Sequence, residues 1–141
     1  MERALARLRE FVKREGLKAS EVRETIARVA LNIKGHFSVD DLMGQLPSLH
    51  ASTVYRVLPV LVDAGLLQEA PPQGDGQRYE RAFEREHHDH LLCTRCGRVI
   101  EFHFDTMEQL ERDVAQRFNF ALTNHVHHLY GLCSKCQRTG R

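Results

Sequence analysis

The stretch that decides the fold is His87-His88-Asp89-His90-Leu91-Leu92-Cys93-Thr94-Arg95-Cys96-Gly97, which holds three imidazoles, a carboxylate and two thiols in one short run. A second thiol pair, Cys133-Ser134-Lys135-Cys136, lies near the end of the chain, and the two pairs contain all four cysteines. Two residues between thiols let a tight turn aim both sulfurs at one ion, and two such turns complete a tetrahedral site. The spacing predicts a closed structural Zn²⁺ site made by Cys93, Cys96, Cys133 and Cys136.

A dithiol redox centre or two disulfides could use the same residues. A redox C-x-x-C usually needs only one pair, at the start of a helix that follows a strand, and nothing in the sequence marks an oxidising compartment. The zinc interpretation is therefore preferred.

The histidines beside the first thiol pair divide into two sets. Leu91–Leu92 and Val99–Phe102 are expected to form a hairpin that turns at Cys93–Cys96. If the extended backbone includes residues 87–90, His87 and Asp89 face one way and His88 and His90 the other. Each set then belongs to a separate metal site, with Glu101, Glu108 and His125 as further candidate ligands. A solvated polar turn is the alternative, but ligands clustered beside a zinc site favour metal binding.

The length and composition of the chain limit the number of domains and the classes of function that it can have. A chain of 141 residues with 42% hydrophobic residues can form one domain or two small ones. No apolar run approaches the length of a membrane span, and the N-terminus lacks the apolar core of a signal peptide, so a cytoplasmic location is expected. The formal net charge is only +1, so charge gives no support for nucleic-acid binding, which must come from a motif.

The first half of the chain has the outline of a winged helix-turn-helix. Helices are expected over residues 2–15, from the cap Ser20 to Gly35, from Ser38 to Pro47, and from Ala51 or Ser52 to Gly65. A hairpin follows, with strands over 66–70 and 77–80 and a turn over 71–76. The helix that begins near Ala51 would be the recognition helix, and it would present Ser52, Thr53, Tyr55 and Arg56 to a major groove. Pro59 removes a hydrogen bond to the carbonyl of Tyr55 and is expected to kink this helix.

The second half begins near Arg85. Asp105 or Thr106 is expected to cap a helix whose apolar face, Met107, Leu110, Val114 and Phe118, serves as core or dimer interface. Glu108 lies off that face. Residues 120–130 are expected to form a strand, with His125 and His127 on one side and Val126, His128 and Tyr130 on the other. For His127 and His128 a surface or packing role is expected.

An ordered set of motifs resembles the ferric uptake regulator family over about residues 16–136. The motifs are Gly16–Lys18, Ser52–Leu58, Asp63–Leu66, His87–Cys93, Cys96–Phe102 and Leu129–Cys133. The resemblance implies an α+β homodimeric repressor that binds an inverted-repeat operator in double-stranded DNA when it is loaded with metal. Its winged-helix DNA-binding domain would cover residues 1–84, and its metal-binding α/β dimerisation domain would cover residues 85–141.

The resemblance also implies two metal sites besides the zinc site. An interdomain regulatory site matches His36, Glu80, His88, His90 and Glu101, and a dimerisation-domain site matches His87, Asp89, Glu108 and His125. Lys18, Tyr55 and Arg56 match the family's DNA contacts.

The nitrogen and oxygen ligands of the interdomain set suit Fe²⁺, Mn²⁺ or Zn²⁺. Zinc-sensing members tend to have a cysteine in this site and peroxide-sensing members an aspartate in place of Glu101, so Fe²⁺ sensing is the first expectation. Peroxide, zinc or manganese sensing are the alternatives within the family.

Other classes of protein fit less well. A zinc hydrolase or deaminase would need H-E-x-x-H or the H-x-E signature, which the chain lacks. A metal-storage protein would have no use for residues 52–58 or for a wing. We therefore expect no enzymatic activity, no small-molecule substrate and no membrane association.

Overall fold

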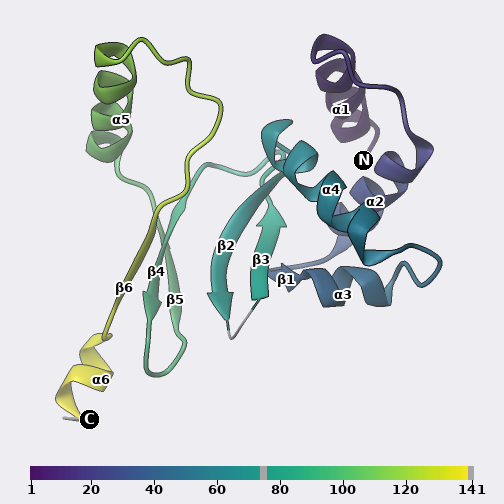
Figure 1. The fold of residues 1–141 in the computed structure, drawn as a ribbon. Coiled ribbons are helices and arrows are strands. Elements are labelled where there is room, and N and C mark those ends of the chain that lie inside the picture. Colours follow the sequence, from purple (N-terminus) through teal and green to yellow (C-terminus); the bar gives the residue numbers. More distant parts are fainter. Residues whose placement is uncertain (74–75, 140–141) are drawn as a thin grey trace. The chain divides into compact units, whose positions relative to one another are not determined.

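The structure is a computed structural model that describes residues 1–73 and 76–139 (Figure 1). The chain divides into two compact units, Met1–Glu86 and His87–Arg141. No helix in the described part is long and apolar enough to cross a membrane.

The N-terminal unit is a winged helix-turn-helix. Its elements are α1 (Glu2–Arg14), α2 (Glu21–Asn32), β1 (Phe37–Ser38), α3 (Val39–Gly44), α4 (Ala51–Asp63), β2 (Leu67–Gln73) and β3 (Gly76–Arg81). The strand order is β1-β3-β2, and both pairings are antiparallel. Helix α4 contacts α2, α3 and β2, so the second helix of the helix-turn-helix is held from three directions (Figure 1).

Local sequence signals explain the helix starts. The Ser20 hydroxyl accepts a hydrogen bond from the backbone N–H of Arg23 and so caps α2. At α3, Ser38 and Asp41 form a reciprocal capping box, with hydrogen bonds of 2.9 and 3.1 Å. These two predicted caps are confirmed.

The apolar face of each helix in this unit packs into one core. Leu5, Leu8, Ile26, Leu42, Leu58 and Leu61 are at most 1% exposed. The core is closed by the sheet, where Phe37 of β1 lies against Tyr79 of β3. The sequence does not predict the two-residue strand β1, which is too short to leave a periodic pattern.

The predicted turn over residues 71–76 is wrong in part. Pro71 and Pro72 lie within β2, where the register shifts between Ala70 and Gln73. Proline cannot donate to a ladder, so it is tolerated at an irregularity of this kind. The tip of the hairpin, residues 74–75, lies outside the described residues.

The C-terminal unit is a three-stranded sheet with two helices. Its elements are β4 (Asp89–Cys93), β5 (Val99–Phe102), α5 (Asp105–Arg117), β6 (His128–Gly131) and α6 (Ser134–Arg138). Strand β4 is central, antiparallel to β5 and parallel to β6. Figure 1 shows α5 and α6 at opposite ends of this sheet.

Two predictions for this unit are wrong. Helix α5 begins after Phe104 without a side-chain cap, because the Asp105 carboxylate is bonded to His103 at 2.7 Å instead. The predicted strand over residues 120–130 is regular only from His128 to Gly131. A strand needs a neighbouring backbone to pair with, and of residues 120–127 only His127 joins the ladder, by accepting the N–H of His90 through its carbonyl.

Candidate metal centres and recognition helix

The four cysteines gather at the end of β4 that is followed by the β4–β5 turn. Cys93 ends β4, Cys96 lies in the turn, and Cys133 and Cys136 flank the start of α6. Gly97 has φ +78° and its N–H donates to the carbonyl of Cys93 at 3.0 Å, which closes the turn. All four sulfurs lie within 4.8 Å of one another, and the four cysteines are free rather than disulfide-bonded.

This arrangement fits zinc. The Cys96 and Cys133 sulfurs are 3.9 Å apart, and Zn–S bonds of about 2.3 Å in a tetrahedron place two sulfurs about 3.8 Å apart. The backbone N–H of Cys133 donates to the Cys93 sulfur at 3.4 Å, and together with the backbone N–H groups of Cys96 and Arg95 it lowers the pKa of that thiol to about 5. Burial raises the pKa of Cys136 to about 12. The spacing of the four sulfurs therefore suits a structural Zn²⁺, which a closed set of four thiolates binds best.

A second cluster lies at the other end of β4. Asp89 begins β4 and His87 lies two residues before it, while Glu108 comes from the first turn of α5 and His125 from the irregular segment before β6. The Nε2 atom of His87 is 3.1 Å from Glu108 Oε1, 3.5 Å from Asp89 Oδ1 and 2.6 Å from His125 Nε2. His125 Nε2 is 3.7 Å from Asp89 and 3.8 Å from Glu108.

Hydrogen bonds alone do not explain this convergence. A ring nitrogen carries at most one hydrogen and can direct it at one acceptor, whereas each Nε2 here faces two carboxylates and another nitrogen. Glu108 Oε1 is also buried without a hydrogen bond of acceptable geometry. Ligand bonds of about 2.1 Å in a tetrahedron place ligand atoms about 3.4 Å apart, which resembles most of these distances. The four side chains therefore fit a divalent cation.

Glu111, which is not among the residues predicted as ligands, also touches this cluster. Its Oε2 atom is 2.7 Å from Nδ1 of His125, and its Oε1 atom contacts Nε2 of His127. A helical spacing of three residues from Glu108 could have identified it, because residues three apart share a face of a helix.

A third group of candidate ligands lies on β4 and β5. His90 is the register partner of Glu101, and Nε2 of His88 is 3.6 Å from Glu101 Oε1. The rings of His88 and His90 are 5.0 Å apart, and the two residues are 9% and 1% exposed. The histidines thus separate into the two sets that strand alternation predicts, although β4 itself begins only at Asp89.

The N-terminal unit carries the remaining two candidate ligands. His36 precedes β1 and Glu80 lies on β3, and their Nε2 and Oε2 atoms are 3.0 Å apart. The Glu80 carboxylate also accepts a hydrogen bond from Gln68 at 2.6 Å and lies 3.5 Å from Arg85. The structure therefore brings His36 and Glu80 together within their own unit.

The candidate DNA contacts lie at the start of α4. Ser52, Tyr55 and Arg56 are exposed, and Thr53 is half-buried. Tyr55 is 57% exposed, an unusual position for a large aromatic side chain unless it has a partner. Lys18 is exposed just before α2. Pro59 lies in the same helix, which continues through it to Asp63.

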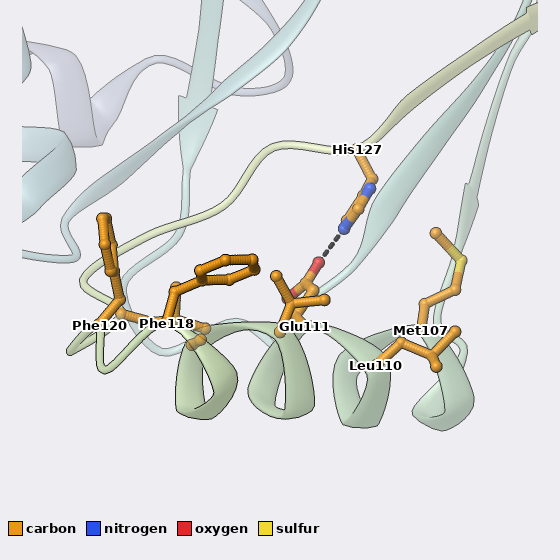
Figure 2. A pocket seen from close by; sticks show the side chains of 9 residues that line it. Met107, Leu110, Glu111, Phe118, Phe120 and His127 are labelled. Carbon is orange, nitrogen blue, oxygen red and sulfur yellow. Dashed lines mark hydrogen bonds and ion pairs between the residues drawn. The ribbon is translucent and has the colours of Figure 1, made fainter.

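An apolar hollow lies along α5 in the C-terminal unit (Figure 2). It has a volume of 630 Å³ and is lined by Met107, Leu110, Glu111, Val114, Ala115, Phe118, Phe120, Leu122 and His127. Leu110, Val114 and Phe118 are 58–66% exposed. Such a contiguous apolar patch is typical of an interface.

The chain is similar to the proteins of one family. The family model described as the ferric uptake regulator family matches residues 14–139. The ferric uptake regulation protein of Klebsiella pneumoniae is 37% identical over 91% of this chain and 86% of its own length.

Solved structures of ferric uptake regulators have a similar fold. The Helicobacter pylori ferric uptake regulator, described as having three functional metal binding sites, superposes with a TM-score of 0.64, at 31% identity over 96% of this chain and 93% of the other. The Pseudomonas aeruginosa ferric uptake regulator with manganese has a TM-score of 0.62, at 27% identity over 87% and 95%. The chain belongs to the ferric uptake regulator family.

Proposed function

We propose that this protein is a metal-responsive repressor that binds an inverted-repeat DNA operator as a homodimer when a regulatory divalent cation is bound. The observation that carries the proposal is the distribution of nitrogen and oxygen ligands over the two units. His36 and Glu80 meet in the N-terminal unit, and His88, His90 and Glu101 are clustered in the C-terminal unit.

A cation that recruits both sets would favour one relative orientation of the two domains. A ligand shifts a conformational equilibrium only through its differential affinity for the two states, and a site shared by two domains provides this difference. In a two-fold dimer the domain orientation sets the spacing of the recognition helices, which must match half-sites about 34 Å apart. Ser52, Thr53, Tyr55 and Arg56 on α4 would then contact the major groove, and Lys18 the neighbouring backbone or minor groove.

The homodimer is supported by the apolar surface of the C-terminal unit. Of the apolar side chains on α5 only Ala115 is buried, while Leu110, Val114 and Phe118 remain exposed. The exposed apolar face of α5 needs a partner that covers it. A second copy of the chain presents the same apolar face, so the two faces can pack against each other in a two-fold dimer.

Fe²⁺ is the proposed regulatory ion, with Zn²⁺ held by the four cysteines. The regulatory set offers only imidazole and carboxylate ligands, because every cysteine belongs to the sulfur cluster. The similarity to the ferric uptake regulation protein of Klebsiella pneumoniae and to the Helicobacter pylori ferric uptake regulator supports this choice over zinc.

The test is anaerobic binding of the zinc-loaded protein to an AT-rich inverted-repeat duplex, with Fe²⁺, Mn²⁺ and Zn²⁺ titrated separately and a peroxide pulse at the end. We expect binding that requires Fe²⁺ or Mn²⁺ and survives mild peroxide. Loss of binding with histidine oxidation would assign the protein to the peroxide-sensing branch, and dependence on Zn²⁺ alone to the zinc-sensing branch.

A double variant, His88→Ala with His90→Ala, should abolish the metal dependence. His103→Gln is the matched control, because it removes an exposed imidazole of the same unit that is paired with Asp105. Metal-dependent binding that is equal in the double variant and the control would contradict the proposed switch.

A further inference from the structure

Two side chains outside the proposed ligand sets extend the cluster at the start of β4. Glu108 and Glu111 lie one turn apart on α5, and His125 and His127 lie two residues apart on the facing segment. Residues at these spacings point to the same side of a helix or of an extended chain. The result is a ladder in which Glu108 faces His125 and Glu111 reaches both His125 and His127.

The two oxygens of Glu111 serve different histidines. Oε2 lies 2.7 Å from Nδ1 of His125, and Oε1 contacts Nε2 of His127, as the dashed line in Figure 2 shows. His125 directs its other nitrogen, Nε2, toward His87, Asp89 and Glu108. The imidazole therefore has a carboxylate on one side and the convergent ligand atoms on the other.

This geometry selects a tautomer. A neutral imidazole has one N–H, and the other nitrogen has the lone pair that binds a metal. With its hydrogen on Nδ1, donated to Glu111, His125 presents the Nε2 lone pair to the cluster. A charged carboxylate behind the ring also makes the imidazole a more basic ligand.

We propose that Glu111 is the positioning residue of the dimerisation-domain metal site, and that His127 holds Glu111 in place. Glu111 fixes the tautomer and the ring orientation of His125 through the Nδ1 hydrogen bond. His127 donates to the second oxygen of Glu111, which stops the carboxylate from turning away. This inference rests on the proposed function, in which His87, Asp89, Glu108 and His125 hold a divalent cation.

The positioning role is needed because the segment that carries His125 is irregular. Residues 118–127 lie between α5 and β6, and of residues 120–127 only His127 joins the sheet. A ligand on such a segment has no ladder to fix its ring, whereas Glu111 projects from a regular helix. Glu111 and His127 both line the apolar hollow along α5, and the Glu111 side chain is 19% exposed.

The experiment measures Mn²⁺ binding to the full-length, zinc-loaded protein by equilibrium dialysis, with zinc content checked in each variant. Loss of an outer hydrogen-bond partner weakens metal binding by about 10- to 100-fold. We expect Glu111→Leu to weaken the binding of one Mn²⁺ ion per chain by this factor. Glu111→Gln should lose less affinity, because its amide oxygen still accepts a hydrogen bond from Nδ1 of His125. His127→Leu should have a smaller effect of the same sign.

Asp113→Leu is the matched control. Asp113 is an exposed carboxylate on the same helix that is bonded to Gln109, so its loss should leave Mn²⁺ binding unchanged. A structural role for Glu111 would lower stability without changing the tautomer of His125. We therefore also follow the side-chain ¹⁵N signals of His125 in protein that carries only the structural Zn²⁺, because an ion bound at Nε2 would by itself force the hydrogen onto Nδ1. The Nδ1–H form should be lost in Glu111→Leu and retained in Asp113→Leu.

Unchanged affinity and an unchanged tautomer in Glu111→Leu would overturn the positioning role. Loss of a whole Mn²⁺ equivalent in His127→Leu, with the remaining ions bound as in the parent, would also overturn it, since Glu111 and His127 would then hold an ion of their own. A separate variant, His125→Ala, tests the underlying site. If it binds as many Mn²⁺ ions as the parent, the cluster is not a metal site, and both the inference and that part of the proposed function are wrong.

Discussion

The Glu80 carboxylate lies 3.0 Å from the imidazole Nε2 of His36, and the Glu80 side chain is only 1% exposed. A carboxylate this deeply buried is retained only when other groups compensate its charge, and Gln68, Arg85 and His36 all approach it. The N-terminal unit therefore holds a fixed carboxylate next to an imidazole, as the proposed regulatory site requires.

Glu80→Gln removes this charge at nearly constant volume. We expect the metal concentration needed for DNA binding to rise at least tenfold, because an amide is a weaker ligand than a carboxylate. Thermal unfolding should change little, since Gln68 can still bond to the amide. The control is Glu84→Gln, which alters an exposed carboxylate paired with Arg3. An equal response in both variants would argue against Glu80 as a ligand.

Removal of one thiol from the sulfur cluster should destabilise the C-terminal unit. Cys96→Ser leaves three thiols, and we expect zinc content to fall from one ion per chain toward zero. Because α6 is only five residues long and is anchored by Cys133 and Cys136, it should lose its helical structure. Zinc analysis and hydrogen exchange measure the two effects. Retention of one zinc with unaltered exchange in α6 would contradict the four-cysteine site.

Arg56 should contribute to operator affinity and not to metal binding. Arg56→Ala removes an exposed guanidinium from the start of α4, and loss of a base or phosphate contact costs about 1–3 kcal/mol, or roughly 5- to 150-fold in affinity. Binding is measured with the operator duplex at fixed salt. Arg14→Ala, at the exposed end of α1, is the control and should keep parental affinity.

A charge in the apolar patch of α5 should separate the subunits. Val114 is 58% exposed within that patch, and Val114→Asp would place a carboxylate against the partner's apolar side chains. Sedimentation is expected to show a monomer. Arg112→Asp introduces the same group at an exposed position outside the patch and should leave the dimer intact. A dimeric Val114→Asp protein would place the interface elsewhere.

Pro59→Ala should stabilise the N-terminal unit. The substitution restores an N–H that can bond to the carbonyl of Tyr55, a gain of about 3 kcal/mol in a helix interior, against a loss of up to about 1 kcal/mol from the less restricted unfolded chain. We expect a net gain of about 2 kcal/mol in the free energy of unfolding. Denaturant titration measures this change. Destabilisation would show that the proline is required by the path of α4 rather than tolerated.

Short-range chemistry accounts for what the sequence predicts well. Ser20 and Ser38 cap helices because the partners of their hydroxyls lie three residues away, and the period of two along residues 87–90 separates the histidines without any knowledge of the fold. Long-range chemistry accounts for the failures. Residues 120–126 alternate like a strand but have no neighbouring backbone to pair with, and Asp105 is engaged by His103 rather than by the helix end. The spacing from Glu108 indicates the side of the helix on which Glu111 lies, but its partners His125 and His127 come from a segment that meets α5 only in the folded unit.

The candidate metal sites of the C-terminal unit all depend on strand β4, which limits how this strand can change during evolution. It ends in Cys93, contains Asp89 and His90, and follows His87 and His88. Five ligands within residues 87–93, a run about 20 Å long, therefore serve every candidate site of the C-terminal unit. If one residue were deleted from β4, every ligand on one side of the deletion would point to the opposite face of the sheet, and several sites would be lost together. Substitutions on α5 or in residues 118–127 alter one site at a time. We therefore expect relatives to vary more readily in these two segments than in residues 87–93, with the length of β4 held constant.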